Sequence, residues 1–382
     1  MLARLTVGNV AGTLLAGAAV AAVSLPGGDA ADATSAATEP SPGARGAAAA
    51  ASATAPQEAE RYTLAGDRFA VHNLVGEVEI RRGVGSDLTV TVRRGGDDAG
   101  RLEIAIGEID GRQTLRVLYP GDRVVYDGYR GETHIDVDDD GTLDGGGLFG
   151  GREVRITGDG SGLRAHADLV IEVPEGARLE VHTGVGGAAA RGVTGDLSLD
   201  VASGGVEVRD HAGALEVDTG SGSVRVAGVR GDLHLDTGSG SVRVSDVEGE
   251  RIGLDTGSGN VRGSGLTASE LDADTGSGGI DLAEVSAPRL RLDTGSGSIR
   301  VGLLTDVDHL EADTGSGSVE LLVPEDFGSS LRVETGSGGI DIDGLDVDVD
   351  HMGDDGFRGS VGDGRGETVI DTGSGSVRLR RG

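Results

Sequence analysis

The sequence predicts an all-β fold: a single-array β-solenoid of the β-helix or β-roll kind, with two short strands in each coil of 18 to 21 residues. Three observations predict it. A five-residue motif, Asp-Thr-Gly-Ser-Gly, recurs at intervals close to one coil, and apolar residues alternate with polar ones between the copies. The 382 residues also include 71 glycines but only four Tyr, four Phe and no Trp, which suits tight turns around a thin core.

The repeats fill most of the second half of the chain. Their successive starts, counted from a degenerate copy at His182, lie 18, 18, 18, 19, 19, 19, 20 and 21 residues apart, and a last gap of 37 is close to two periods. A fixed period of this length indicates stacked coils, each contacting only its neighbours. The motif or a close variant begins at His182, Asp200, Asp218, Asp236, Asp255, Asp274, Asp293, Asp313, Glu334 and Asp371.

One repeat shows how a coil would fold. Leu215 and Val217 alternate with acidic residues, so both would face the interior from one strand. Gly220-Ser221-Gly222 would then turn the chain, and Val224 opens a second alternating strand. Neither strand can bury its apolar face alone, whereas coils stacked about 4.8 Å apart would form continuous Val, Leu and Ile ladders.

The first 60 residues differ in composition from the rest. Residues 1–30 fit a signal peptide, because a long uncharged run follows Arg4 and cleavage is expected near Ala30 or Ala33. An uncleaved membrane anchor is the alternative. Residues 31–60 are rich in Ala, Pro, Ser and Thr, which is typical of a linker. The mature protein is therefore expected to be extracytoplasmic (secreted, periplasmic or at the cell surface) with no membrane span.

The remaining chain divides into an irregular and a regular part. Residues 61–180 carry strand signals without the motif and are expected to form irregular N-terminal coils, with an acidic, Gly-rich excursion at about 120–151. Residues 181–382 are expected to form the regular solenoid, with a second excursion at about 343–366. The chain stops directly after a strand at Leu379-Arg-Arg-Gly382, and Arg residues on such an exposed edge would discourage end-to-end stacking.

The charge and the missing residue types exclude several classes of function. There are 64 acidic residues against 33 basic ones, all of them Arg, and the formal net charge is −31. Such an acidic chain is a poor binder of nucleic acids, since phosphate contacts need clustered basic residues. The absence of Cys excludes thiol catalysis and thiolate metal sites, and the absence of Lys excludes Schiff-base chemistry.

Three features together resemble a known family. They are the strand from Val71 to Ile80, the segment from Asp168 to Val181 with Val-Pro-Glu-Gly at its centre, and the Thr-Gly-Ser-Gly-Ser-Val repeats. These resemble a bacterial family of exported β-strand repeat proteins, which is catalogued as a domain of unknown function and labelled as candidate adhesins. The resemblance covers most of residues 61–382 and implies a β-solenoid outside the cytoplasm.

The Asp that opens each repeat would stand one coil from its neighbours. Carboxylates about 4.8 Å apart repel by roughly 0.9 kcal/mol in water before screening, so a compensating interaction is expected. Either each Asp caps its own Thr-Gly-Ser turn, or Ca²⁺ binds between coils. Capping is favoured, because calcium β-rolls place the Asp after the glycines. Outward Arg residues on the other strand would add opposite charge: Arg225, Arg243, Arg262 and Arg300.

A more specific cation site is predicted in the first excursion. Asp136, Asp138 and Asp140 alternate before Gly141, and Asp144 would supply a ninth-position ligand, as in loops that wrap a hard cation. Ca²⁺ is therefore the one possible cofactor, and a solvated acidic loop is the alternative. The eight His residues show no metal-binding spacing; those on predicted strands are expected to be exposed, namely His182, His211 and His234.

Repetition of the same chemistry in every coil favours an extended binding or structural surface over an enzyme, whose site needs one unique constellation. The prediction is a non-enzymatic, exported cell-surface or envelope protein, adhesin-like, with a glycan or protein partner. Two alternatives stay open. One is a β-helix polysaccharide lyase or hydrolase with a site in the loop excursions, and the other is a calcium-dependent structural scaffold.

Overall fold

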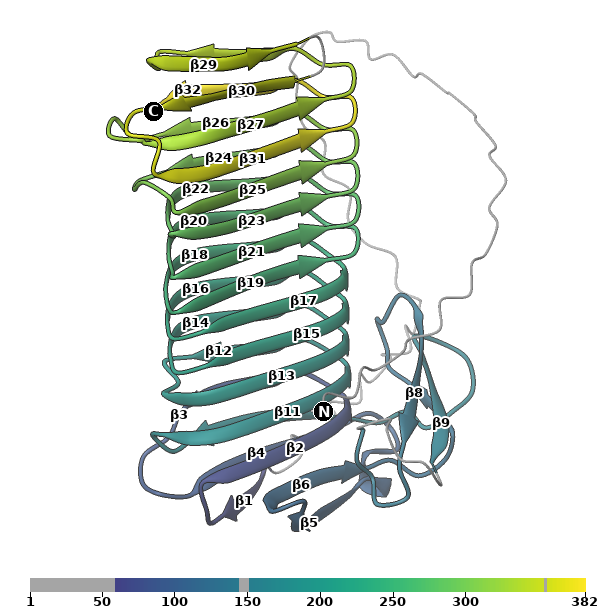
Figure 1. Cartoon of the computed structure of the whole chain (residues 1–382). Helices are drawn as coiled ribbons and strands as arrows, with labels where there is room; N and C mark the ends of the chain where they lie inside the picture. Colours follow the sequence, from purple (N-terminus) through teal and green to yellow (C-terminus); the bar gives the residue numbers. More distant parts are fainter. Residues whose placement is uncertain (1–58, 144–150, 354–355) are drawn as a thin grey trace, which may run out of the picture. The chain divides into compact units, whose positions relative to one another are not determined.

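The structure, a computed structural model, describes residues 59–143, 151–353 and 356–382. Contacts divide the chain into residues 1–56 and 57–382, and the description below concerns the second unit. The predicted signal peptide lies outside the described residues, as does nearly all of the linker. The predicted β-solenoid is confirmed: the described chain is almost entirely β-strand, with one 3-10 helix, η1 (Ala99–Arg101) (Figure 1). Among the described residues, no helix is both long enough and apolar enough to cross a membrane.

Two long sheets, A with fourteen strands and B with fifteen, make up the stack. Sheet A contains, in spatial order, β1 (Glu60–Leu64), β4 (Leu88–Gly95), β10 (His166–Val173), β3 (Val78–Arg82), β12 (Ala188–Arg191), β14 (Val206–Ala212), β16 (Val224–Arg230), β18 (Val242–Glu248), β20 (Val261–Thr267), β22 (Ile280–Ser286), β24 (Ile299–Leu303), β26 (Val319–Val323), β32 (Val377–Arg381) and β28 (Ile340–Asp343). Sheet B contains β29 (Val347–Met352), β30 (Gly356–Val361), β27 (Ser329–Thr335), β31 (Gly366–Thr372), β25 (His309–Thr314), β23 (Arg289–Thr294), β21 (Glu270–Thr275), β19 (Arg251–Thr256), β17 (Leu233–Ser239), β15 (Leu215–Ser221), β13 (Gly195–Ser203), β11 (Ala177–Val185), β2 (Arg68–Val75), β6 (Arg112–Leu118) and β5 (Glu103–Ile109).

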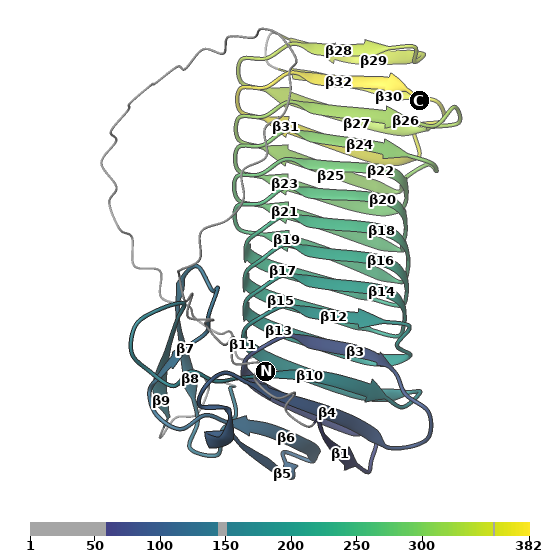
Figure 2. The same ribbon diagram turned by 180° about the vertical axis from the view of Figure 1, so that it is seen from behind.

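In the middle of the stack each coil contributes one strand to each sheet (Figures 1 and 2). β15 pairs in parallel with β17, and β16 with β18, so every repeat position meets its counterpart in the next coil. Leu215 and Val217 are buried and pair with Leu233 and Leu235, which are buried too. These inward ladders form the continuous core that the alternating pattern predicts.

The motif's threonine closes the turn between the two strands. The Thr275 hydroxyl donates to the carbonyl of Gly259 in the preceding coil, at 2.9 Å, and accepts the N–H of Gly278, at 3.1 Å. Thr294 and Thr314 repeat this pair of bonds in the next coils. Within the described residues, no hydrogen bond reaches the carboxylates of the seven motif Asp residues from 218 to 371. The predicted Asp cap was therefore wrong, because a buried hydroxyl can serve donor and acceptor at once.

The second glycine of the motif is required by the closeness of the coils. A Cβ at Gly297 would lie 1.7 Å from the carbonyl oxygen of Gly278, and one at Gly222 would lie 1.8 Å from that of Gly204. No side chain fits at such distances. The spacing between coils, set by strand hydrogen bonds, thus fixes a glycine at this position of each repeat.

At the C-terminal end, the spatial order of the strands differs from the chain order. β31 lies between β25 and β27, and β32 lies between β26 and β28. The last coil is therefore inserted between two coils that precede it in the sequence. On the other edge of β27, β30 pairs antiparallel and forms a hairpin with β29. The 37-residue gap thus holds a hairpin and a return of the chain, and not two stacked periods.

The edge of the stack at this end is formed by β28 and β29. The prediction that the terminal Arg residues form an exposed edge was wrong, because β32 is enclosed within sheet A and Arg380 lies 4.0 Å from Glu320 of β26. The edge strands are acidic instead, which also opposes pairing with another chain. Their carboxylates are those of Asp341, Asp343, Asp348 and Asp350.

Antiparallel strands close the N-terminal end. β4 pairs antiparallel with both β1 and β10, and β5 pairs antiparallel with β6. β2 and β3 form a coil in register with the stack, and β3 lies between β10 and β12. A buried network joins these segments: the Asn73 amide donates to the Ala167 carbonyl at 2.8 Å, and the Tyr119 hydroxyl donates to Asn73 Oδ1 at 2.9 Å.

The first excursion folds into a sheet of its own, consisting of β7 (Arg123–Val125), β9 (Arg152–Thr157) and β8 (Glu132–Val137). β8 packs against β11 and β13 of sheet B, and the Tyr129 hydroxyl lies 3.2 Å from that of Ser203. The excursion extends past residue 151, since a bridge from Leu163 to Val124 still belongs to it.

Candidate functional site

The parallel register turns each outward repeat position into a column of side chains along the stack. On sheet B, Asp218 pairs with Asp236; on sheet A, Arg225 pairs with Arg243. The two columns face away from each other, because the sheets are the two faces of the coils. We define the aspartate column as Asp200, Asp218, Asp236, Asp255, Asp274, Asp293, Asp313 and Asp371. The sheet A column is Glu207, Arg225, Arg243, Arg262, Asp281, Arg300, Glu320, Arg378 and Asp341.

The carboxylates of the aspartate column repel one another. Partial desolvation by the stacked strands, and then the charges of Asp200 and Asp236, raise the pKa of Asp218 to about 6. Desolvation also raises the pKa of Asp255, Asp274 and Asp313. The predicted neutralisation by outward Arg residues of the other strand was wrong. Those residues lie on the opposite face, and from Asp218 onward no ion pair to this column occurs among the described residues.

The aspartate column begins at two stacked histidines. His182 Nδ1 lies 3.3 Å from the Asp200 carboxylate, and its ring lies 4.6 Å from that of His72 between ring centres. Burial, and next the closeness of His182, lower the pKa of His72, whose Nδ1 accepts the N–H of Leu143. The expectation of exposed strand histidines was wrong for His211, which is 2% exposed, and His182 is also largely enclosed.

The predicted calcium loop is described only in part. Asp136 lies in β8 opposite Glu153, while Asp138 and Asp140 lie in the turn that follows. Oδ1 of Asp140 accepts the N–H and the hydroxyl of Thr142, at 3.0 and 2.9 Å, which holds that carboxylate within the turn. Asp144 lies outside the described residues. Among the side chains that are described, no three acidic or His groups gather as metal ligands do, and the calcium site stays a prediction.

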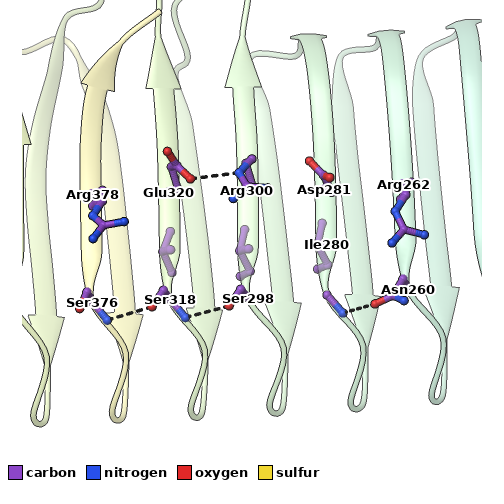
Figure 3. A pocket seen from close by; sticks show the side chains of 13 residues that line it. Asn260, Arg262, Ile280, Asp281, Ser298, Arg300, Ser318, Glu320, Ser376 and Arg378 are labelled. Atoms are coloured by element: carbon purple, nitrogen blue, oxygen red, sulfur yellow. Dashed lines mark hydrogen bonds and ion pairs between the residues drawn. The ribbon is translucent and has the colours of Figure 1, made fainter. Parts of the chain in front are cut away.

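A polar groove lies on the outer face of sheet A and crosses five coils (Figure 3). Its volume is about 230 Å³. Beside the Gly turns it is lined by Asn260, Ser298, Ser318 and Ser376, and two residues further along the strands by Arg262, Asp281, Arg300, Glu320 and Arg378.

The groove is ordered by bonds between successive coils. Asn260 Oδ1 accepts the N–H of Gly279 at 2.8 Å, and the Ser298 hydroxyl accepts the N–H of Ser318 at 3.2 Å. An ion pair of 3.0 Å joins Arg300 to Glu320. The groove therefore presents hydroxyls, an amide and charges of both signs at the spacing of the coils, which suits hydrogen bonding to a long hydrophilic partner.

The sequence predicts part of this groove. Its alternating pattern places Arg262 and Arg300 on the outer face, but it does not connect Asp281, Glu320 and Arg378 with them. The signal was present, because each of the five follows the second motif glycine by three residues. The last of them could not be placed, since its coil enters the stack out of chain order.

Comparison with known proteins relates the chain to one family. The sequence model of the family described as Toastrack DUF4097 matches residues 154–380. A solved structure of a candidate cell adhesion protein from Clostridium sporogenes is similar, with 11% identity over 85% of this chain and 100% of that one. The TM-score between the two is 0.22. A search of the curated proteins finds no match.

Proposed function

The chain belongs to the Toastrack DUF4097 family, and we propose that it is a non-enzymatic, exported surface or envelope protein that binds an extended partner along the outer face of sheet A, as an adhesin does. The family assignment leaves the function open, so the proposal rests on the surface itself. The observation that carries it is the groove of sheet A, where five successive coils present hydroxyl, amide and charged groups to solvent.

The shape of the surface favours binding over catalysis. Each coil offers a polar residue at the same two strand positions, whereas an enzyme concentrates unique groups with matched pKa values at one point. A partner that repeats along its own length, such as a glycan or an extended polypeptide, can contact several coils at once, and the weak contacts then add up. Export is supported by the long uncharged run that follows Arg4 at the N-terminus.

The test is binding of the full chain to bacterial cells, envelope fragments and an array of purified glycans. Arg300→Glu with Arg378→Glu should weaken binding by at least tenfold, because both side chains line the groove. The matched control is Arg291→Glu with Arg332→Glu, which changes the net charge equally on the outer face of sheet B. Binding by neither cells nor glycans, or equal loss in both variants, would refute a binding role for this face.

A further inference from the structure

Next to the groove, sheet A carries three Arg residues on successive coils. Arg225 on β16 pairs with Arg243 on β18, and Arg243 pairs with Arg262 on β20. All three side chains are exposed. We call them the arginine strip, and its last member also lines the groove.

The strip has no counter-charge of its own. Many Arg residues elsewhere are held by carboxylates, such as Arg178 by Asp196 at 2.7 Å and Arg300 by Glu320 at 3.0 Å. No carboxylate of the described chain lies within ion-pair distance of the strip, although acidic residues outnumber basic ones by 64 to 33. Guanidinium groups one coil apart repel each other, so this arrangement does not stabilise the fold. An external anion would relieve the repulsion.

The strip is short and bounded at both ends. At one end, Glu207 lies in the same column but is engaged by Arg209, at 2.7 Å. At the other end Asp281 opens the mixed part of the groove. The residues on either side of the strip are small and uncharged, which leaves room for a chain lying along the stack: Ser223, Ser241 and Asn260 toward the turns, and Ala227, Ser245 and Ser264 beyond.

The negative net charge of the protein opposes anion binding at the strip only from a distance. The aspartate column lies on the other sheet, and packed sheets are separated by about 10 Å. The Debye length is about 8 Å at 0.15 M salt, about 30 Å at 0.01 M and about 3 Å at 1 M. At physiological salt the opposite face is therefore largely screened, while a group in contact with the strip still experiences its charge.

We propose that the arginine strip binds a linear acidic polysaccharide, with carboxylate or sulfate groups on the guanidinium groups and sugar hydroxyls on the Ser and Asn side chains of the adjoining groove. This inference rests on the proposed function and names its ligand class. A polysaccharide fits better than single-stranded nucleic acid, because stacking platforms for bases need aromatic side chains. No Trp, Tyr or Phe lies on β16, β18 or β20.

The test measures binding of the full chain to polygalacturonate and to dextran sulfate, with neutral dextran and single-stranded DNA as comparisons. Arg225→Gln, Arg243→Gln and Arg262→Gln together should weaken polyanion binding at least tenfold at 0.15 M salt. The control replaces Arg289, Arg291 and Arg332 of sheet B by Gln, an equal change of net charge, and should leave affinity within twofold. Preference for polygalacturonate or for dextran sulfate identifies the anionic group.

Salt dependence provides a second readout. Affinity of the unaltered chain should rise from 0.01 M to about 0.15 M salt, as the repulsion by the net charge is screened, and fall again toward 1 M. The proposal would be overturned if the strip variant and the unaltered chain bound the polyanions with equal affinity. It would also be overturned if the unaltered chain bound single-stranded DNA as tightly as polysaccharide. If neutral glycans or cells bind the groove while polyanions do not, the proposed function stands and this inference alone fails.

Discussion

The middle of the stack and its two ends use the same kinds of strand but follow different rules of assembly. From β12 to β24, each strand pairs with the strand two places further along the chain. At the C-terminal end β31 separates β25 from β27, and at the N-terminal end β3 separates β10 from β12. Coils that are neighbours in space are therefore consecutive in the sequence only in the middle.

This difference shows what a repeat can and cannot specify. Every coil offers the same edges and the same inward ladder, so the repeat determines how two coils meet but not which two coils meet. The choice at the ends depends on segments that do not repeat, such as the hairpin of β29 and β30, which covers the outer edge of β27. The last coil can then pair only with the inner edge of β27.

The largest effect should follow from removing the inserted coil, residues 366–382. Its buried Ile370, Val377 and Leu379 would be lost, and β25 and β27 would each keep an unpaired edge. With about 1.5–3 kcal/mol for each buried apolar side chain, the C-terminal part should lose roughly 5 kcal/mol or more. Denaturant unfolding and amide hydrogen exchange in β27 measure this loss.

The matched control removes one coil from the middle, residues 256–274, so that Asp255 joins Thr275 and the motif is restored. This deletion should cost much less, because the coils on either side carry the same edges. A truncated chain as stable as the full one would contradict the prediction. It would show that β27 can shift and pair with β25 in chain order.

A smaller loss is expected from filling the turn. Gly297→Ala places a Cβ 1.7 Å from the Gly278 carbonyl oxygen, so the two coils must separate, and overpacking of this kind costs about 1–3 kcal/mol. Gly339→Ala, beside the edge strand β28, meets no atom within 4 Å and should change stability by less than about 0.5 kcal/mol. Thermal unfolding of both variants compares the closed middle with the open end. Equal shifts of the melting temperature would contradict the prediction.

Most of the fold could be predicted from the sequence, and the part that could not has a physical reason. Alternation at Leu215 and Val217 predicts the strands and their inward faces because side-chain direction is local. The Thr hydroxyl as turn cap was missed, since Asp and Thr both cap turns and only burial distinguishes them. In the groove, Arg262 and Arg300 could be assigned to the outer face, whereas the place of Arg378 depends on long-range pairing.

The hydroxyl of the motif threonine should matter in the middle and not at the start of the regular stack. Thr275→Val keeps the shape but leaves the Gly259 carbonyl and the Gly278 N–H without a partner, so a loss of roughly 1–2 kcal/mol is expected. Thr183, in the first regular strand β11, is buried and its hydroxyl has no partner among the described residues. Thr183→Val should therefore be neutral or slightly stabilising in chemical unfolding. A loss of stability equal to that of Thr275→Val would contradict the predicted difference between the two sites.

The smallest effect concerns charge and has opposite signs in the two regions. In the middle, the pKa of Asp218 is raised to about 6 from 3.8, so its ionisation destabilises the fold above about pH 6, and this penalty disappears as the pH falls below about 4. Asp218→Asn should raise stability at pH 7 by less than about 1 kcal/mol, because the side chain reaches solvent, and should change nothing below pH 4.

At the C-terminal end, Arg365 holds the pKa of Asp363 below its usual value, so its carboxylate stabilises the fold at neutral pH and that contribution is lost in acid. Asp363→Asn should thus lower stability at pH 7 and have no effect in strong acid. Thermal unfolding of both variants from pH 2.5 to 8 measures the signs. Shifts in the same direction would show that desolvation and repulsion within the aspartate column do not govern the pKa of Asp218.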